Sequence, residues 1–180
     1  MNTKYREVED LVRKYDTRNP YELLDAIGAV TRFAYDFDGD GDGLKGFATI
    51  MNGISYCVVN GNLSEDDRRI VAGHEAAHLI LHRQDILNSP ACSLSDFNLY
   101  DNSGKLEFEA NCFLADFLVS DEDVMDIMTD PDLDYFSAAR MLRLVPPLFS
   151  FKLYSMIQRG HNLKIPDFMQ SKFLAKKNFS

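Results

Sequence analysis

The chain has 180 residues, of which 46% are hydrophobic and 26% charged, as is typical of a globular protein with one core. No apolar run approaches the roughly 20 residues that span a bilayer, and the charged N-terminus lacks the apolar region of a secretory signal, so we expect a cytoplasmic protein with no membrane association. Three widely spaced cysteines without a CxxC pair argue against a disulfide framework.

The net charge of −9 is unevenly distributed along the chain. Residues 1–139 hold 11 Lys and Arg against 27 Asp and Glu, whereas residues 140–180 hold 8 against 1. The asymmetry fits either a solvated acidic surface with a basic tail, or an acidic body that attracts a basic partner through long-range electrostatics. Direct nucleic-acid binding is not expected for a chain of this net charge.

The first 30 residues predict two helices. Apolar side chains recur at helical spacing between Tyr5 and Tyr15. Asn19 followed by Pro20 supplies an N-cap and a first helical residue for the second helix.

Residues 31–60 predict a small antiparallel sheet. The segment 47–60 is rich in β-branched and aromatic residues on both sides of Asn52-Gly53, a dipeptide typical of the type I′ turn that joins two hairpin strands. Before it, Asp38, Asp40 and Asp42 alternate with glycines like the first half of an EF-hand loop. The twelfth position should hold a glutamate but holds Thr49, so the segment predicts an acidic loop, with weak calcium binding as the alternative.

The rest of the chain predicts helices. Ser64 is expected to cap a helix over 65–83, and residues 88–104 predict a loop by composition. The further expected helices cover 105–118, a short acidic segment capped by Ser120 or Asp121, 133–144 and, after Pro146-Pro147, 147–159. The chain is therefore expected to be a mainly helical α+β single domain over 1–180, made of N-terminal helices (1–30), the sheet (31–60), two central helices (64–118) and C-terminal helices (121–180).

The predicted helix 65–83 carries the motif HEAAH at residues 74–78. Positions i and i+4 share one helix face, so His74 and His78 can direct ring nitrogens at one tetrahedral Zn²⁺. Glu75 is rotated by about 100° from His74 and would lie beside the metal, where it can take a proton from an attacking water. The alternative is that both histidines are satisfied core residues, because so short a motif also arises by chance.

A catalytic zinc site needs a third protein ligand, and the helix 105–118 offers one. Glu107 and Asn111 lie at i and i+4 on one face, so Glu107 could bind the metal. Asn111 could then form a hydrogen bond with the ring nitrogen of a ligand histidine that does not bind the metal. Glu109 is rotated by about 200° from Glu107 and is not expected to share that face.

Two segments, 58–82 with HExxH and 106–120 with the pattern E-x-x-A-N, resemble the ImmA/IrrE-type metallopeptidases. The resemblance includes the preceding hairpin and, more weakly, the helices at 133–159. It implies a zincin-like fold of the gluzincin kind, with HExxH on the active-site helix. It also implies that His74, His78 and Glu107 bind the metal, that Glu75 is the catalytic base and acid, and that Asn111 supports a ligand. The sequence departs from the family at Ala77, where glycine is common, and at Ser120, where proline is common.

The resemblance implies a zinc endopeptidase that cleaves a helix-turn-helix repressor encoded on a prophage or mobile element, and so releases the repressed genes. Mn²⁺ remains open because a His-His-Glu set takes several divalent ions. We expect an edge strand of the 47–60 hairpin to bind the extended substrate by strand addition. The alternatives are a non-proteolytic antirepressor with a structural metal and a peptidase of broad specificity.

Two further histidines are weighed against this site. His82 lies one more turn along the motif helix, and we expect it to pack near the helix end or behind a ligand, because a fourth protein ligand would close the position that catalysis needs. His161 lies in a Gly-His-Asn turn and is expected to be an exposed turn residue, with oxyanion stabilisation as the alternative.

Overall fold

The computed structural model describes residues 3–36, 43–89, 93–96, 104–130 and 132–164. The aspartates of the EF-hand-like segment and the basic residues from Lys172 onward lie outside these ranges. The described residues confirm an α+β fold that is mainly helical, with elements in the order α1 (Thr3–Tyr15), α2 (Pro20–Ala26), β1 (Val30–Ala34), β2 (Gly46–Met51), β3 (Ile54–Asn60), α3 (Glu65–Leu81), α4 (Arg83–Asn88), β4 (Ser93–Asp96), α5 (Lys105–Leu118), α6 (Asp121–Ile127), α7 (Tyr135–Met141) and α8 (Pro146–Gln158).

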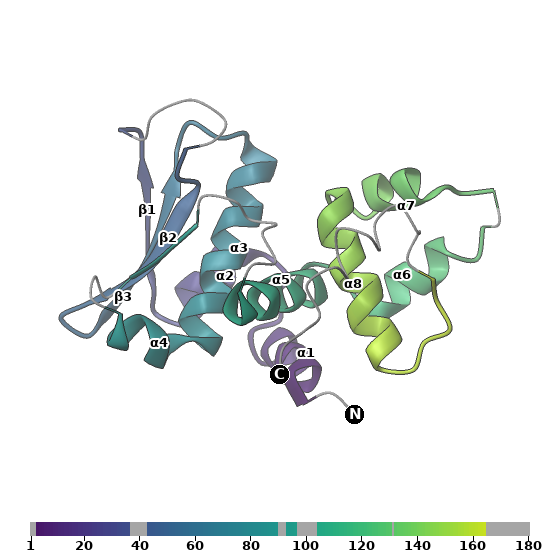
Figure 1. Cartoon of the computed structure of the whole chain (residues 1–180), viewed down its shortest axis with the longest axis horizontal. Helices are drawn as coiled ribbons and strands as arrows, with labels where there is room; N and C mark the ends of the chain where they lie inside the picture. The colour runs from purple at the N-terminus through teal and green to yellow at the C-terminus, as the bar shows by residue number, and fades with distance from the viewer. Residues whose placement is uncertain (1–2, 37–42, 90–92, 97–103, 131, 165–180) are drawn as a thin grey trace.

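The sheet has four strands in the order β1-β3-β2-β4. Figure 1 labels β1, β2 and β3, which lie beside helix α3. Strands β2 and β3 form the predicted hairpin, and Asn52 and Gly53 have φ values of 52° and 79°, as a type I′ turn requires. The prediction of an antiparallel sheet is confirmed for β2, which pairs antiparallel with β3 and β4, but it was wrong for β1, which pairs with β3 in parallel. Residue pattern indicates which segments are strands, but strand order depends on the path of the chain between them.

The outer side of the hairpin is also not an edge. Residues 93–96, within the segment predicted as a loop, form β4, which pairs antiparallel with residues 46–49 of β2. Strand β3 is covered on its other side by β1. The prediction that an edge strand of the hairpin takes up the substrate was therefore wrong, since both hairpin strands lie inside the sheet.

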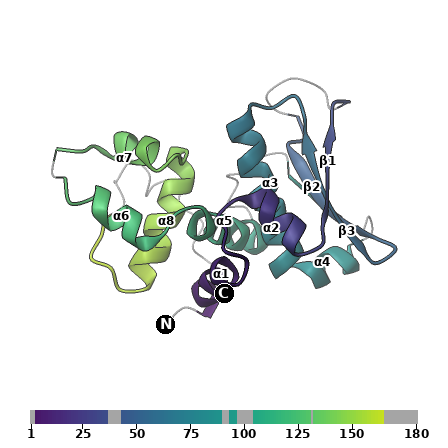
Figure 2. The same cartoon turned by 180° about the vertical axis from the view of Figure 1, so that it is seen from behind.

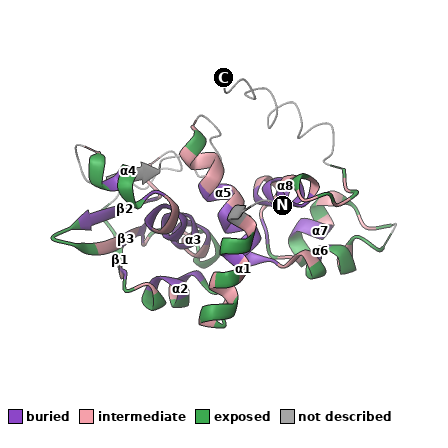
Figure 3. Cartoon of the chain, turned by 90° about the horizontal axis from the view of Figure 1, so that it is seen from below, coloured by how far each residue is buried: buried purple, intermediate pink, exposed green. Residues whose placement is uncertain are grey.

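Helix α3 is the central element of the structure. It begins as predicted, with the Ser64 hydroxyl accepting a hydrogen bond from the Asp67 backbone N–H at 3.1 Å. Every residue from Ile70 to Leu79 is buried, because the helix lies between strands β2 and β3, helix α2 and helix α5 (Figures 1 and 3). The helix ends at Leu81, and His82 forms the junction with α4.

Helix α5 joins the two halves of the molecule. It packs on α3 on one side and on α8 on the other, so that the sheet and the C-terminal helices lie at opposite ends (Figures 1 and 2). Phe108 anchors its first turn to α8, with ring centroids 5.6 Å from Phe151 and 5.3 Å from Tyr154.

Within the described residues, no helix is both long enough and apolar enough to cross a membrane.

The C-terminal helices agree with the caps predicted from sequence. Ser120 caps α6 in a capping box with Asp123, and Pro146 and Pro147 form the first turn of α8. The helix predicted over 133–144 is shorter and covers only Tyr135–Met141, with Asp134 as its N-cap.

A buried ion cluster, formed by Asp116, Asp121, Lys152 and Arg159, ties α5, α6 and α8 together. The fully buried Lys152 Nζ lies 3.0 Å from Asp116 Oδ1 and 2.8 Å from Asp121 Oδ1. Arg159 Nη1 lies 3.3 Å from Asp116 Oδ2, and Nη2 lies 2.6 Å from Asp121 Oδ1. Two cations of the basic C-terminal stretch are thus buried structural groups and are not available to bind nucleic acid.

The electrostatics of Asp121 reflect this arrangement. Burial raises the pKa of its carboxyl, but the contacts with Arg159 and Lys152 outweigh burial and lower the pKa below its usual value. His161 also joins the cluster, because its Nε2 lies 3.2 Å from Asp121 Oδ2. His161 is therefore a partner of Asp121 with 32% of its side chain exposed, and not the freely exposed turn residue that was expected.

Close contact between α3 and α5 depends on Gly73, the residue before the HExxH motif. A Cβ at this position would lie 2.4 Å from Leu114 Cδ1 and 3.2 Å from Pro20 Cγ. We expect Gly73→Ala to lower the free energy of unfolding by about 1–3 kcal/mol, because the buried Leu114 side chain must shift to make room for the added methyl group. Urea unfolding measures the change. Gly104→Ser, where nothing lies within 4 Å of an added Cβ, is the control and should be neutral or slightly stabilising. A Gly73→Ala variant as stable as wild type would contradict this packing.

Candidate metal centre

The structure brings His74, His78 and Glu107 together between α3 and α5. The Nε2 atoms of the two histidines are 3.0 Å apart. Glu107 Oε2 lies 3.0 Å from His74 Nε2, and Glu107 Oε1 lies 3.4 Å from His78 Nε2. Ligands of a tetrahedral zinc at about 2.0–2.1 Å are separated by roughly 3.3 Å, so the three donor groups have the spacing of one ion's coordination shell.

Helix geometry explains how the three groups meet. His74 and His78 lie one turn apart on the face of α3 that contacts α5, and Glu107 is in the first turn of α5. Both histidine side chains are almost completely buried, whereas 27% of the Glu107 side chain is exposed. Solvent therefore reaches the cluster from the side of the carboxylate.

The protonation states suit a divalent cation. Burial lowers the pKa of His78 to about 4, so its imidazole is neutral at neutral pH and can offer a lone pair. Burial raises the pKa of Glu107, but its contacts with His74 and His78 outweigh burial and hold the pKa well below the usual value. The cluster thus combines the neutral imidazole of His78 with the ionised carboxylate of Glu107.

The distal nitrogens of the two histidines also fit a metal site. His74 Nδ1 lies 3.1 Å from Asn111 Oδ1, and His78 Nδ1 lies 2.9 Å from His82 Nδ1. A proton on Nδ1 of His74, donated to the amide oxygen, leaves a lone pair on Nε2 that faces Glu107. The Nε2 lone pairs of the two histidines and the Glu107 carboxylate repel one another at these distances unless a cation lies among them. The three residues therefore fit a divalent ion.

Glu75 is completely buried but lies on the side of α3 that faces the sheet. Its Oε1 lies 3.3 Å from the position that a Cβ on Gly46 would occupy. Burial, together with the nearby Glu75 carboxylate, raises the pKa of the Cys57 thiol in β3. Glu75 is thus outside the three-residue cluster, as its rotation from His74 around the helix predicts. Its side chain packs against the β2–β3 hairpin.

Sequence reasoning gave no role to Glu109. In the structure, Glu109 Oε2 lies 3.2 Å from His82 Nε2, and His82 in turn contacts His78. A signal for this contact exists in the sequence, because a histidine two turns beyond His74 on the same face of a buried helix requires a polar partner.

Comparisons with known proteins agree with these observations. The Peptidase_M78 model, described as an IrrE N-terminal-like domain, matches residues 37–145. A protein of Bacillus phage phi105 named "Uncharacterized immunity region protein 2" is 32% identical over 114 residues, which make up 63% of this chain and 66% of that protein. The chain thus spans just under two thirds of that relative's length. No solved structure matches the chain at a significant level.

The matched range contains His74, Glu75, His78, Glu107 and Asn111. It also covers the whole sheet except β1, together with α3 to α7. Because the match extends over more than half of its residues, the chain belongs to the Peptidase_M78 family of IrrE N-terminal-like domains.

Proposed function

We propose that this protein is a zinc-dependent endopeptidase that cleaves one regulatory protein, a DNA-binding repressor of a prophage or mobile element. The observation that carries the proposal is the convergence of His74, His78 and Glu107 from two helices, with contacts of 3.0–3.4 Å between their donor atoms. Membership of a peptidase family supports the choice of reaction. The fold assignment that goes with the proposal is zincin-like, with HExxH on the active-site helix α3.

The three converging side chains would hold Zn²⁺, or another divalent ion such as Mn²⁺. A bound ion supplies Lewis-acid activation of the attacking water and of the scissile carbonyl. Glu75 takes the proton of the attacking water and delivers it to the leaving amine. Asn111 keeps His74 in the tautomer that presents its Nε2 lone pair. Burial keeps His78 neutral, so its imidazole can offer a lone pair to the ion.

The choice of substrate rests on two observations. The phi105 relative is named as an immunity region protein, a context that suggests a repressor as the substrate. Residues 1–139 are strongly acidic, which suits capture of a basic DNA-binding protein by long-range attraction. Cleavage would then take place in the cytoplasm, without direct contact between the peptidase and DNA.

Metal-dependent cleavage tests the proposal. The purified protein is incubated with a helix-turn-helix repressor of the same genetic element, before and after chelation, and with zinc restored. We expect fragments that disappear on chelation and return with zinc, and a Glu107→Ala variant that has lost both bound zinc and cleavage. Casein in the same assay detects a peptidase of broad specificity. Unchanged zinc content in Glu107→Ala would remove Glu107 from the site, and an intact repressor with zinc-loaded protein would refute the proposed activity.

A further inference from the structure

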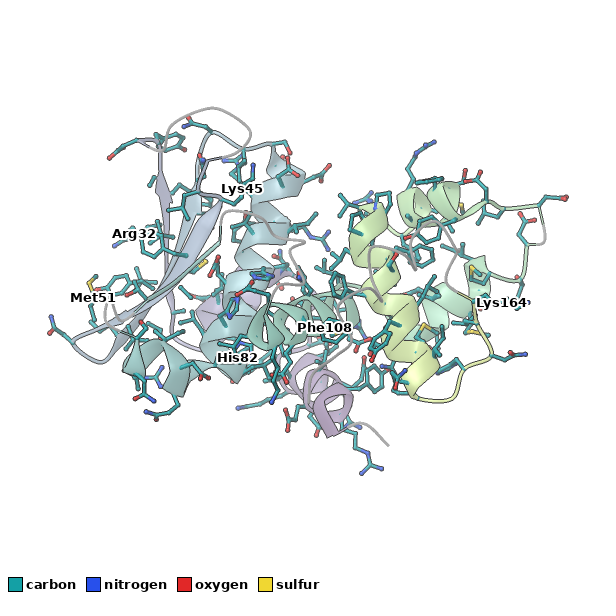
Figure 4. The ribbon with its side chains drawn as sticks, in the orientation of Figure 1. Arg32, Lys45, Met51, His82, Phe108 and Lys164 are labelled. Atoms are coloured by element: carbon teal, nitrogen blue, oxygen red, sulfur yellow. The ribbon has the colours of Figure 1, made fainter. Side chains whose placement is uncertain are left out.

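The metal cluster continues through His78 into a second layer of buried polar groups. His78 Nδ1 lies 2.9 Å from His82 Nδ1, and His82 Nε2 lies 3.2 Å from Glu109 Oε2. His82 is 2% exposed and Glu109 has 18% of its side chain exposed. The three residues in contact therefore extend from His78 in the interior to Glu109 near the surface. Figure 4 shows His82 at the end of α3, beside α5.

We propose that His82 and Glu109 are positioning residues that hold His78 in the one tautomer able to bind a metal through Nε2. The proposal rests on the metal site described under the proposed function. It gives His82 and Glu109 no contact with substrate and no place among the ligands.

The tautomers follow from the three contacts. If His78 binds the metal through Nε2, its proton is on Nδ1 and must be donated to an acceptor. His82 Nδ1 is 2.9 Å away and can accept only if the proton of His82 is on Nε2. That Nε2–H then points at the Glu109 carboxylate, which accepts it at 3.2 Å. One arrangement of protons satisfies all three residues.

Glu109 fixes the direction of this arrangement. A carboxylate only accepts hydrogen bonds, so its contact with His82 Nε2 requires a proton there, and a ring that carries one proton then has Nδ1 as an acceptor. The negative charge, transmitted through one imidazole, also makes His78 a stronger donor to the metal. His74 has a different support, the neutral amide of Asn111. The distal nitrogens of the two ligand histidines therefore have unlike partners: His74 Nδ1 contacts an amide, whereas His78 Nδ1 contacts an imidazole that in turn contacts a carboxylate.

The contacts also tie the end of α3 to α5. The His82 backbone N–H caps α3 by donating to the His78 carbonyl. The His82 side chain meets Glu109, one turn from the start of α5, while Glu107 reaches the metal cluster. A purely structural role for His82 would need this tie but would not require a particular tautomer of either ring.

Zinc affinity of the full chain and the tautomers of its histidines test the proposal. His82→Phe keeps a ring of similar size but removes the acceptor, and we expect zinc affinity, measured by competition with a chromophoric chelator, to fall about 10–100-fold. His82→Gln restores an acceptor and should recover part of the loss. Lys105→Gln, which removes an exposed cation 3.9 Å from Glu109, is the matched control and should leave affinity unchanged.

Two-bond ¹H–¹⁵N correlation spectra of the zinc-loaded protein report the tautomers directly. We expect wild-type His78 with its proton on Nδ1 and His82 with its proton on Nε2, and in Glu109→Leu a His82 that has lost this preference. His82 with its proton on Nδ1 in the wild type would overturn the proposal, even if His82→Phe fails to fold. So would wild-type zinc affinity in a folded His82→Phe variant.

The outcomes separate this inference from the proposed function. Zinc binding by the wild type that Glu107→Ala abolishes and His82→Phe leaves unchanged would refute only the positioning role. A wild-type protein that binds no zinc would refute the metal site and the positioning role together.

Discussion

Glu75→Gln is expected to lower the rate of peptide hydrolysis by about 10²–10⁴-fold while leaving zinc content at the wild-type level. Glutamine keeps the shape of the side chain but cannot accept a proton from water. Glu75 lies outside the His74–His78–Glu107 cluster, so the ligand set is unaffected. The carboxylate is completely buried against Gly46 and near the buried Cys57 thiol. A neutral amide is easier to bury there, and the melting temperature should stay the same or rise.

Three measurements decide the result: initial cleavage rates on the repressor, bound zinc per chain, and the thermal transition. Glu122→Gln, an exposed acid at the start of α6, removes the same charge from the surface and should leave all three unchanged. If Glu75→Gln inactivates the repressor as fully as wild type does, the protein acts by binding its partner and not by proteolysis. The non-proteolytic antirepressor would then be the correct function.

Local chemistry made much of the fold predictable. The Asn-Gly turn, the caps at Asn19, Ser64 and Ser120, and the helix over 105–118 follow from short sequence patterns, and the structure has each of them. Strand β4 was missed because four residues within a polar segment carry no pattern of their own. Their hydrogen bonds come from β2, more than forty residues earlier in the chain.

Helical projection predicted part of the site and misled on another part. Glu107 and Glu109 are about 200° apart around α5, which argues against a shared face. Phe108 lies between them in sequence and faces α8 (Figure 4). Helix α3 packs on the side of α5 opposite Phe108. Each glutamate is rotated by about 100° from Phe108, in opposite senses, and so is only about 80° from the side that faces α3. The two carboxylates therefore reach α3 on opposite flanks, one at His74 and His78 and the other at His82.

The ion cluster could not be predicted from the sequence for a different reason. Lys152 lies among aromatic and aliphatic residues in α8, and its position indicates only that its stem is buried. Its partners come from α5 and α6, so their placement depends on how three helices pack. Such a cluster contributes little if every member is present, but it makes each member costly to remove, because a charge left behind is buried without its counterion.

Asp116→Ala is accordingly expected to lower the free energy of unfolding by about 3–5 kcal/mol. The substitution leaves the fully buried Lys152 with Asp121 as its remaining acidic partner in the cluster, and removes the carboxylate that also accepts hydrogen bonds from Ser155 and Arg159. Urea unfolding at neutral pH, followed by circular dichroism, measures the change.

Two further variants show whether the loss comes from the buried charge. Asp116→Asn keeps an acceptor for Lys152 and Ser155 and should cost less than Asp116→Ala. Asp126→Asn removes an exposed acid of α6 and should change stability by no more than about 0.5 kcal/mol. Combining Asp116→Ala with Lys152→Met removes the ammonium together with one of its two carboxylate partners, so the double variant should be less destabilised than the sum of the two single variants. Additive losses would mean that Asp116 and Lys152 do not act as a pair.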